Sequence, residues 1–255
     1  MAERLVSNSS FTRPSSVGRL KRFWYPNVSS PYKLYQNTVC RFADEAIQVL
    51  DVGCGRTPKV LMNTPLARAL KVGVDVVDEF LVPPDAGVRV VRADCGHLPF
   101  ADACFDLLIC RSVLEHLDVP SSAFQEFYRV LRPGGRFVFL TPNKFDYVSI
   151  GASLIPNRWH PRLVRRMTGR KEQDTFPTWF RANTTRSLRK TASFAGLEIE
   201  ELTLVRQHPH YLGFSTGLYA IGIVYEQILA RWIPQLRPWI LGVLRRPAVE
   251  AEGRR

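Results

Sequence analysis

Residues 47–52 form an apolar run that contains Asp51 near its end and is followed by the turn Gly53-Cys54-Gly55. An apolar run broken by two closely spaced glycines is typical of a buried strand that enters a tight turn. Glycine has no Cβ, so the backbone of such a turn can adopt positive φ and approach a ligand closely. Asp51 adds a negative charge at the carboxyl end of the strand. The pattern predicts a nucleotide site that suits a positively charged ligand better than a pyrophosphate.

Strand and helix patterns alternate through the middle of the chain. Apolar runs predict strands at residues 47–52, 72–76, 88–93, 105–110, 137–140 and 197–205. Helices are predicted at residues 58–70, 121–131 and 184–195, with Ser121 or Ser122 as the cap of the second. Such alternation indicates an α/β fold, in which helices cover both faces of a parallel sheet.

Four segments, taken in order, resemble the motifs of the class I S-adenosylmethionine-dependent methyltransferases. They are Asp51-Val52-Gly53-Cys54-Gly55, Val72-Gly73-Val74-Asp75, residues 93–100 with Phe105-Asp106, and residues 129–137. The resemblance covers roughly residues 45–145. It is nearest to the small-molecule group that includes the quinone-biosynthesis methyltransferases. It implies a Rossmann-like, mostly parallel, seven-stranded sheet, with S-adenosylmethionine as the cofactor.

The resemblance places the methionine part of the cofactor beside the first and fourth strands. The backbone of Gly53-Cys54-Gly55 would approach it, and Asp51 would hold its amino group. Arg111 and Ser112, just past the fourth strand, would lie next to the same end. A guanidinium close to a sulfonium is unfavourable unless it turns toward a carboxylate, which speaks against a direct contact between Arg111 and the donor sulfur.

The adenosine part of the cofactor would lie beside the second and third strands. Asp75, followed by Val76, would accept hydrogen bonds from the ribose hydroxyls, because a carboxylate offers two oxygens to two donors. By the same resemblance, Asp94 would accept from the adenine amino group and the backbone of Cys95 would contact the ring. His97 belongs to this adenine loop and is a poor candidate for a base.

Methyl transfer from a sulfonium is a direct displacement, so the protein mainly aligns the reactants and excludes water. No metal is required, and the sequence has no Cys-x-x-Cys pair. A hydroxyl acceptor would need a base. His160, in the segment after the fifth predicted strand, and His116, after the fourth, are the catalytic candidates. A structural role for either histidine stays open, and His208 and His210 are candidates to line a lid.

A nicotinamide dinucleotide-binding domain is the nearest alternative on physical grounds. Its glycine fingerprint requires a third glycine three residues after the second. Here that position holds Pro58. Asp51 would also repel a pyrophosphate. Both departures favour the methyl donor over the dinucleotide.

The net charge of +12 is unevenly distributed along the chain. Residues 41–150 carry 12 basic and 14 acidic side chains, whereas residues 158–190 carry ten basic and two acidic ones. A basic surface attracts a phosphorylated or carboxylated substrate, a lipid headgroup or nucleic acid. No RNA-binding module is recognisable, so nucleic acid is not expected. A merely solvated basic face remains an alternative.

Aromatic residues gather at two places outside the predicted domain. Residues 23–26, with Tyr32 and Tyr35, either cover the donor by cation–π attraction or pack a helix onto the sheet. Residues 207–246 are apolar and aromatic, but the uncharged run at 211–225 is shorter than a usual membrane span. An interfacial helix, a lid and a dimer face are its three interpretations. The flanking basic residues are Arg231, Arg237, Arg245 and Arg246.

We expect an N-terminal arm with an aromatic cap at residues 1–40 and a methyltransferase domain at 41–206 with a basic insertion at about 142–182. Residues 207–255 would form an extension. A polar beginning and five scattered cysteines predict a cytoplasmic protein, with peripheral attachment to an anionic membrane left open. The expected function is methyl transfer to a small or lipid-linked acceptor, at oxygen, with an anionic acceptor favoured by the basic charge. RNA methylation and a non-catalytic binding role are the alternatives.

Overall fold

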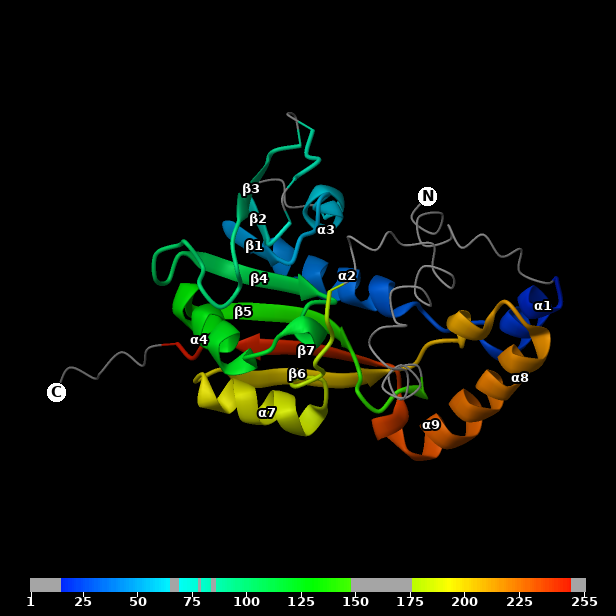
Figure 1. The fold of residues 1–255 in the computed structure, drawn as a ribbon. Coiled ribbons are helices and arrows are strands. Elements are labelled where there is room, and N and C mark those ends of the chain that lie inside the picture. The colour runs from blue at the N-terminus through cyan, green and yellow to red at the C-terminus, as the bar shows by residue number, and fades with distance from the viewer. Residues whose placement is uncertain (1–14, 65–68, 78, 84–85, 148–175, 249–255) are drawn as a thin grey trace. The chain divides into compact units, whose positions relative to one another are not determined.

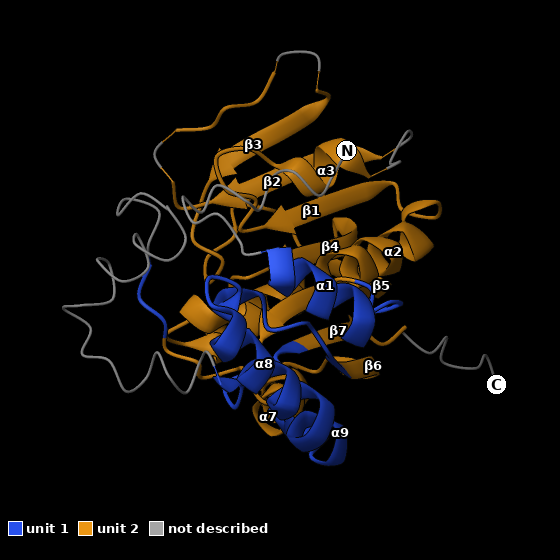
Figure 2. Cartoon of the chain, turned by 90° about the vertical axis from the view of Figure 1, so that its right-hand side faces the viewer, with its two compact units in different colours: residues 1–29, 143–178, 204–239 blue, residues 30–142, 179–203, 240–255 orange. Residues whose placement is uncertain are grey.

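The structure of the chain is a computed structural model that describes residues 15–64, 69–77, 79–83, 86–147 and 176–248 (Figure 1). The chain divides into two compact units, shown in different colours in Figure 2. Unit 1 comprises Met1–Ser29, Asn143–Thr178 and Leu204–Trp239. Unit 2 comprises Ser30–Pro142, Trp179–Thr203 and Ile240–Arg255. Each unit is therefore assembled from segments that are distant in the sequence.

Unit 2 is built on a seven-stranded sheet with the strand order β3-β2-β1-β4-β5-β7-β6. Strands β1 to β5 run parallel to one another, and Figure 1 shows β7 running the opposite way. This mixed, mostly parallel sheet confirms the predicted Rossmann-like α/β fold. The strands are β1 Gln48–Val52, β2 Leu70–Asp75, β3 Val88–Arg92, β4 Phe105–Arg111, β5 Leu131–Pro142, β6 Glu198–Val205 and β7 Trp239–Arg245.

The seventh strand, β7, comes from the segment that the sequence treats as an extension. It lies between β5 and β6. Gly134 N donates to Arg246 O and Arg246 N donates to Gly135 O, both at 2.9 Å, which holds the carboxyl end of β7 beside the early part of β5. A Cβ at Gly242 would overlap the Phe139 ring, so only glycine lets the two strands approach this closely. The predicted extension thus contributes a strand to the sheet.

Helices pack on both faces of the sheet. Helix α4 (Pro120–Val130) lies with α7 (Thr185–Phe194) on one face, and α2 (Pro31–Ala43) lies on the other (Figure 1). Phe124 and Phe127 of α4 stack against Phe137 of β5, with ring centroids 5.9 and 4.8 Å apart. All three rings are fully buried, and each such ring stabilises the core by about 2–3 kcal/mol. This aromatic layer holds β4 and β5, and therefore the carboxyl edge of the sheet, in place.

Two helix predictions are wrong in detail. The helix expected at residues 58–70 is only α3, Lys59–Asn63, and Leu70 already belongs to β2. Neither serine caps α4, because Pro120 occupies its first turn, where the fixed φ of proline starts the helix earlier. Ser122 instead donates its hydroxyl to the carbonyl of Gly96 at 3.2 Å. The predicted helix at 184–195 is confirmed as α7, with Thr184 as its N-cap.

Unit 1 is helical. It contains α1 (Ser15–Trp24), η5 (His210–Leu212), α8 (Thr216–Val224), the π-turn η6 (Tyr225–Leu229), α9 (Ala230–Trp232) and η7 (Pro234–Leu236). Its buried core joins Val17 and Tyr25 at the two ends of α1 to Tyr219 and Ile223 of α8. Among the helices that the structure describes, none is both long enough and apolar enough to cross a membrane.

Candidate functional site

The turn after β1 brings backbone groups to the carboxyl edge of the sheet in unit 2. Gly53 and Gly55 have φ of 73° and 68°, a region that favours glycine. Gly53 N and Cys54 N both donate to the carbonyl of Val74 on β2, at 2.8 and 3.1 Å. A Cβ at Gly53 would overlap Val113, whereas a Cβ at Gly55 would meet nothing within 4 Å. The turn is therefore packed at Gly53 and open at Gly55, the side from which a ligand can approach.

Asp75 ends β2 and ties the turn to that strand. Its Oδ2 accepts a hydrogen bond from Gly55 N at 2.7 Å, and its Oδ1 accepts one from Val77 N at 3.2 Å. A carboxylate has about four acceptor positions, so these two bonds leave room for two further donors. The neighbouring Val76 is 45% exposed. The carboxylate is thus held in place by backbone and can still accept hydrogen bonds from a diol.

Asp51 is the buried charge of the site, with 3% of its surface exposed. Burial raises its pKa to about 7; the charge of Arg111 opposes this shift and that of Asp75 adds to it. The guanidinium of Arg111 lies over the ring of Tyr32, 5.2 Å from its centroid. The positive charge of Arg111 therefore opposes the effect of burial on the pKa of Asp51, while its role beside a cofactor stays a prediction. A carboxyl group that titrates near neutrality is poised to ionise when a cation arrives.

Asp94 follows β3 and is exposed. Its Oδ1 accepts a hydrogen bond from Gly96 N at 2.6 Å, which turns the chain and leaves Oδ2 free of any bond among the described residues. Burial raises the pKa of the adjacent Cys95 thiol to about 12. Cys95 is consequently an uncharged side chain next to an exposed acceptor, a suitable arrangement beside an amino-substituted heterocycle.

This carboxyl edge, with its glycine turn and its aspartates at successive strand ends, matches known proteins. The family described as "Methyltransferase domain" matches residues 50–139, from β1 to β5. The chain carries a class I methyltransferase domain. The fold agrees: the solved YcgJ protein of Bacillus subtilis superposes with a TM-score of 0.53 over 84% of this chain and 99% of that one, at 16% identity.

Three curated relatives share parts of the methyltransferase domain. A probable S-adenosylmethionine-dependent methyltransferase of Mycolicibacterium smegmatis is 34% identical over 134 residues, 51% of this chain and 50% of that protein. The ubiquinone/menaquinone biosynthesis C-methyltransferase UbiE of Haemophilus ducreyi is 34% identical over 97 residues, 37% of each chain. A malonyl-[acyl-carrier protein] O-methyltransferase of Herminiimonas arsenicoxydans is 38% identical over 97 residues, 36% of each. The chain thus spans half or less of the length of these relatives.

The methyltransferase domain uses Cys54 for packing. A Cβ at Gly73 would lie 2.7 Å from the sulfur of Cys54, which shows how tightly the thiol fills the space above β2. Burial, the largest cause, and the charges of Asp51 and Asp75 raise the pKa of the thiol far above its usual value. Only the backbone of Cys54 is therefore available to a ligand. Ser112, with φ of 57°, is held by its N–H bond to the carbonyl of Leu140 at 2.9 Å.

Sequence reasoning missed a buried polar network at the ends of β4 and β5 in the methyltransferase domain. Thr141 Oγ1 donates to Glu115 Oε2 at 3.1 Å, and Asn183 Nδ2 donates to Thr141 Oγ1 at 2.6 Å. The main-chain oxygen of Glu115 also accepts from Trp179 N and Phe180 N, at 2.8 and 3.2 Å. The network anchors the returning segment that leads to α7. The only signal in the sequence was the position of Glu115 beside a candidate histidine.

The two catalytic candidates, His116 and His160, differ in whether the structure describes them. His116 lies in η2 (Leu114–His116), with Nε2 3.9 Å from Oε1 of Glu115. It is half-buried at the same edge as Ser112, so its catalytic role stays a prediction. His160 lies outside the described residues, as does most of the predicted basic insertion. Within the part of the chain that the structure describes, no group of His, Cys, Asp and Glu side chains could hold a metal ion.

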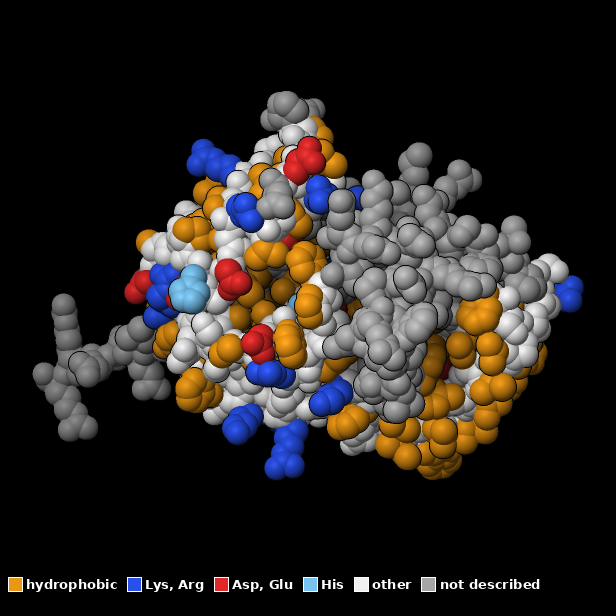
Figure 3. Space-filling view, viewed as in Figure 1, with side chains coloured by type: hydrophobic (Ala, Val, Ile, Leu, Met, Phe, Trp, Pro, Cys, Tyr) orange, Lys and Arg blue, Asp and Glu red, His pale blue; other side chains and the backbone are white. Residues whose placement is uncertain are grey.

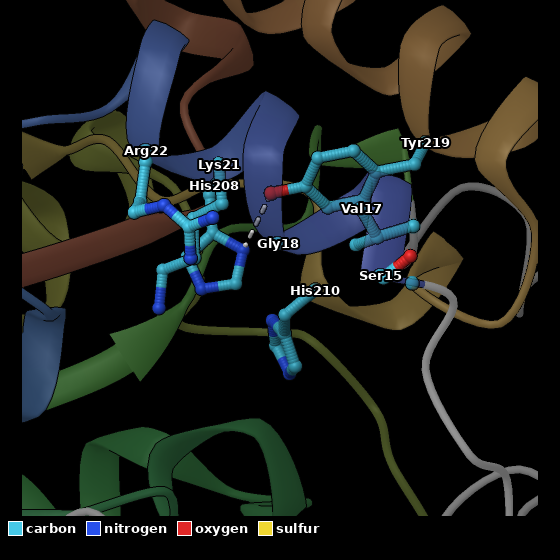
Figure 4. Close-up of a pocket in the computed structure, with 9 residues that line it drawn as sticks. Ser15, Val17, Gly18, Lys21, Arg22, His208, His210 and Tyr219 are labelled. Carbon is cyan, nitrogen blue, oxygen red and sulfur yellow. Dashed lines mark hydrogen bonds between the residues drawn. The ribbon is translucent and has the colours of Figure 1, made fainter.

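Two further histidines line a cavity of about 330 Å³ within unit 1 (Figure 4). His208 and His210 lie in its wall with Lys21 and Arg22 of α1. Tyr219 Oη and Nδ1 of His208 form a hydrogen bond of 3.3 Å. The two histidines therefore belong to unit 1 and not to the cofactor edge of the methyltransferase domain.

Proposed function

We propose that this chain transfers a methyl group from S-adenosylmethionine to a small-molecule acceptor. The observation that carries the proposal is the set of aspartates at the carboxyl ends of β1, β2 and β3, around a glycine turn that is open on one side. In parallel α/β sheets this edge is where ligands bind. Asp51, Asp75 and Asp94 supply three acceptors there, and a cationic ligand with a diol and an amino-substituted base would use all three.

The residues present fit that cofactor. Asp75 keeps unused acceptor positions for the ribose hydroxyls, and Gly55 leaves open space beside the turn. Asp51, ionised by the approach of an ammonium group, would hold the amino end, and Arg111 would keep its charge directed at that carboxylate. When bound, S-adenosylmethionine supplies a methyl group already activated by the sulfonium. The protein then aligns the acceptor and excludes water.

We also propose that the acceptor is a small or lipid-linked molecule, favoured when anionic, that is methylated at oxygen. The basic residues at 158–190 support an anionic acceptor. A relative named as a malonyl-[acyl-carrier protein] O-methyltransferase supports oxygen. Methylation at carbon, as the name of the Haemophilus ducreyi relative states for that protein, is the competing outcome.

His116 is our candidate for the general base, and Glu115 is the residue that would position it. Glu115 is only 6% exposed and fixed through Thr141, so its carboxylate can orient the imidazole from one side. His160 remains a second candidate. An active-site base shows a pH profile of kcat that follows its titration. Replacement by His116→Gln should lower kcat without changing the affinity for the cofactor.

Calorimetry with S-adenosylmethionine and its demethylated product tests the cofactor assignment. Asp75→Ala removes two charge-assisted hydrogen bonds to ribose, so its affinity for either ligand should fall by about 100-fold. Asp44→Ala, at an exposed aspartate after α2, is the matched control and should bind like the parent. Equal affinity in the Asp75 variant would contradict the ribose assignment.

The calorimetric titration, together with a methyl-transfer assay, separates the alternative functions. A non-catalytic protein with this fold would bind neither the donor nor the product. An RNA methyltransferase would bind both but transfer the methyl group to RNA instead of a small acceptor, which an assay with isotopically labelled donor detects. The cytoplasmic location stays a prediction.

A further inference from the structure

The helical segment of unit 1 from Thr216 to Trp232 exposes a strip of large apolar side chains. Figure 3 shows hydrophobic side chains gathered over α8 and α9. Their exposed fractions run from 41% to 79%, and their spacing of three to four residues places them on one helical face. We call this surface the apolar strip; it consists of Leu218, Ile221, Val224, Ile228, Leu229 and Trp232.

The opposite face of the same helix is already packed. Tyr219 and Ile223, 1% and 4% exposed, join the core of unit 1. Helix α8 is therefore apolar around most of its circumference, yet the described residues of unit 1 bury only one side of it. Apolar helices of that kind are found inside proteins or in contact with lipid. The apolar strip consequently calls for an apolar environment beyond the described part of unit 1.

Helix α1 adds two aromatic rings to unit 1. Phe23 is 75% exposed and Trp24 is 45% exposed, and their rings meet edge to face with centroids 5.4 Å apart. Gln227 Nε2 donates to the carbonyl of Trp24 at 3.1 Å, which joins the end of α1 to the π-turn in the middle of the apolar strip. Tryptophan and phenylalanine are common on the apolar face of helices that lie in a membrane interface.

Within the part of unit 1 that the structure describes, the exposed charged side chains carry one sign. In the described residues of unit 1, the acidic side chains are Asp146 and Glu226, and both are buried, at 4% and 0% exposure. The exposed charged side chains there are basic: Arg19, Lys21, Arg22, Lys144 and Arg231. A surface that combines exposed apolar side chains with only positive charge is complementary to an anionic bilayer.

We propose that unit 1 docks on an anionic lipid bilayer through the apolar strip together with Phe23 and Trp24. The strip is about 25 Å long, long enough to lie along the interface but carried by helices that do not span it. A second copy of the chain is a poorer occupant, because it would bring the same positive charges against each other. Docking does not depend on methyl transfer, and it would suit a lipid-linked acceptor.

Sedimentation of the full chain with vesicles tests this proposal. We expect binding to vesicles of phosphatidylcholine and phosphatidylglycerol in equal parts, and much weaker binding to phosphatidylcholine alone. Ile228→Ser combined with Trp232→Ser should weaken binding to the mixed vesicles by at least about tenfold. Arg19→Gln and Arg231→Gln should each weaken it by about fivefold, since one basic residue near such a surface contributes about 1 kcal/mol.

The controls come from α7 in unit 2. Phe194→Ser removes a side chain that is 67% exposed, and Arg189→Gln removes an exposed charge; both should leave vesicle binding unchanged. No sedimentation with anionic vesicles, or equal loss in the control variants, would overturn the proposal. So would concentration-dependent self-association in analytical ultracentrifugation that Trp232→Ser abolishes. Cofactor binding measured on the same samples shows whether the methyltransferase assignment stands independently.

Discussion

Asp51 in unit 2 and Glu226 in unit 1 are both buried carboxyl groups, but their surroundings differ. Burial is the largest cause that raises the pKa of each, to about 7 for Asp51 and about 8 for Glu226. At Asp51 the next cause is the Arg111 guanidinium, which lowers the pKa. At Glu226 the next cause is the charge of Asp146, which raises it further. Neither carboxyl oxygen of Glu226 has a hydrogen-bond partner in the structure.

The comparison shows that desolvation of a carboxyl group has different consequences in the two units. Asp51 lies near the carboxyl end of β1, and the charge of Arg111 favours its ionised form, so it can ionise when a cation binds. Glu226 lies in a π-turn beneath an apolar strip and is held neutral near neutral pH. The surroundings of Asp51 suit a positively charged ligand. The surroundings of Glu226 suit a helical segment that is packed on one side and apolar on the other.

The largest effect is expected in the glycine turn. Gly53→Ala adds a Cβ that overlaps Val113 and forces an alanine to φ of 73°. The free energy of unfolding should fall by about 3–4 kcal/mol, and cofactor binding should be lost. Gly55→Ala carries the same backbone strain without the overlap, so it should cost only about 1–2 kcal/mol. Urea denaturation of the two variants measures the difference, and equal costs would show that the turn is not tightly packed against Val113.

Two isoleucines of α8 test whether the helix is packed on one side only. Ile223→Ala should lower the free energy of unfolding by about 3 kcal/mol, because the side chain is 4% exposed and lies in the core of unit 1. Ile221→Ala, at 65% exposure, should change it by less than about 0.5 kcal/mol. Thermal and urea unfolding measure both. A large cost at Ile221 would mean that the strip is covered in solution.

Stability should depend on pH through Glu226. The pKa of this carboxyl in the folded state, about 8, exceeds its ordinary value of 4.5, so the folded chain holds the proton more tightly than the unfolded chain. Its contribution is complete below pH 4.5 and is lost as the pH rises through 8. The free energy of unfolding of Glu226→Gln, relative to that of the parent, should therefore increase by on the order of 2 kcal/mol between about pH 5 and about pH 9. Denaturation curves at both pH values measure this difference. An unchanged difference in the free energy of unfolding would show that the carboxyl group of Glu226 is solvated.

The smallest effect concerns cofactor affinity. Because the pKa of Asp51 is about 7, protons compete with the cationic ligand below that pH. Affinity should rise by up to about tenfold per pH unit between about pH 5.5 and pH 7, and then level off. Asp51→Asn should bind more weakly and show a flat profile in calorimetry. Asp75→Asn leaves Asp51 in place but removes a charge that raises its pKa, so the pH dependence should persist and shift to lower pH.

Local patterns were enough to predict which residues lie at the carboxyl edge of the sheet. The positive φ at Gly53 and Gly55 is a conformation that glycine favours, and each aspartate lies within or just after a short, largely apolar run that indicates a strand. Since parallel strands end at the same edge, placing the strands also brought Asp51, Asp75 and Asp94 together. The length of α3 and the cap of α4 were mispredicted because proline and tertiary contacts override weak local preferences.

By itself the sequence determined the glycine turn, the acidic strand ends and the α/β alternation, because each depends on neighbouring residues. Only the tertiary structure decided that β7 enters the sheet beside β5, that Thr141 joins Glu115 to Asn183, and which face of α8 is covered. These features bring together residues far apart in the chain. Their pairing depends on packing and hydrogen-bond geometry, for which no local pattern carries a signal.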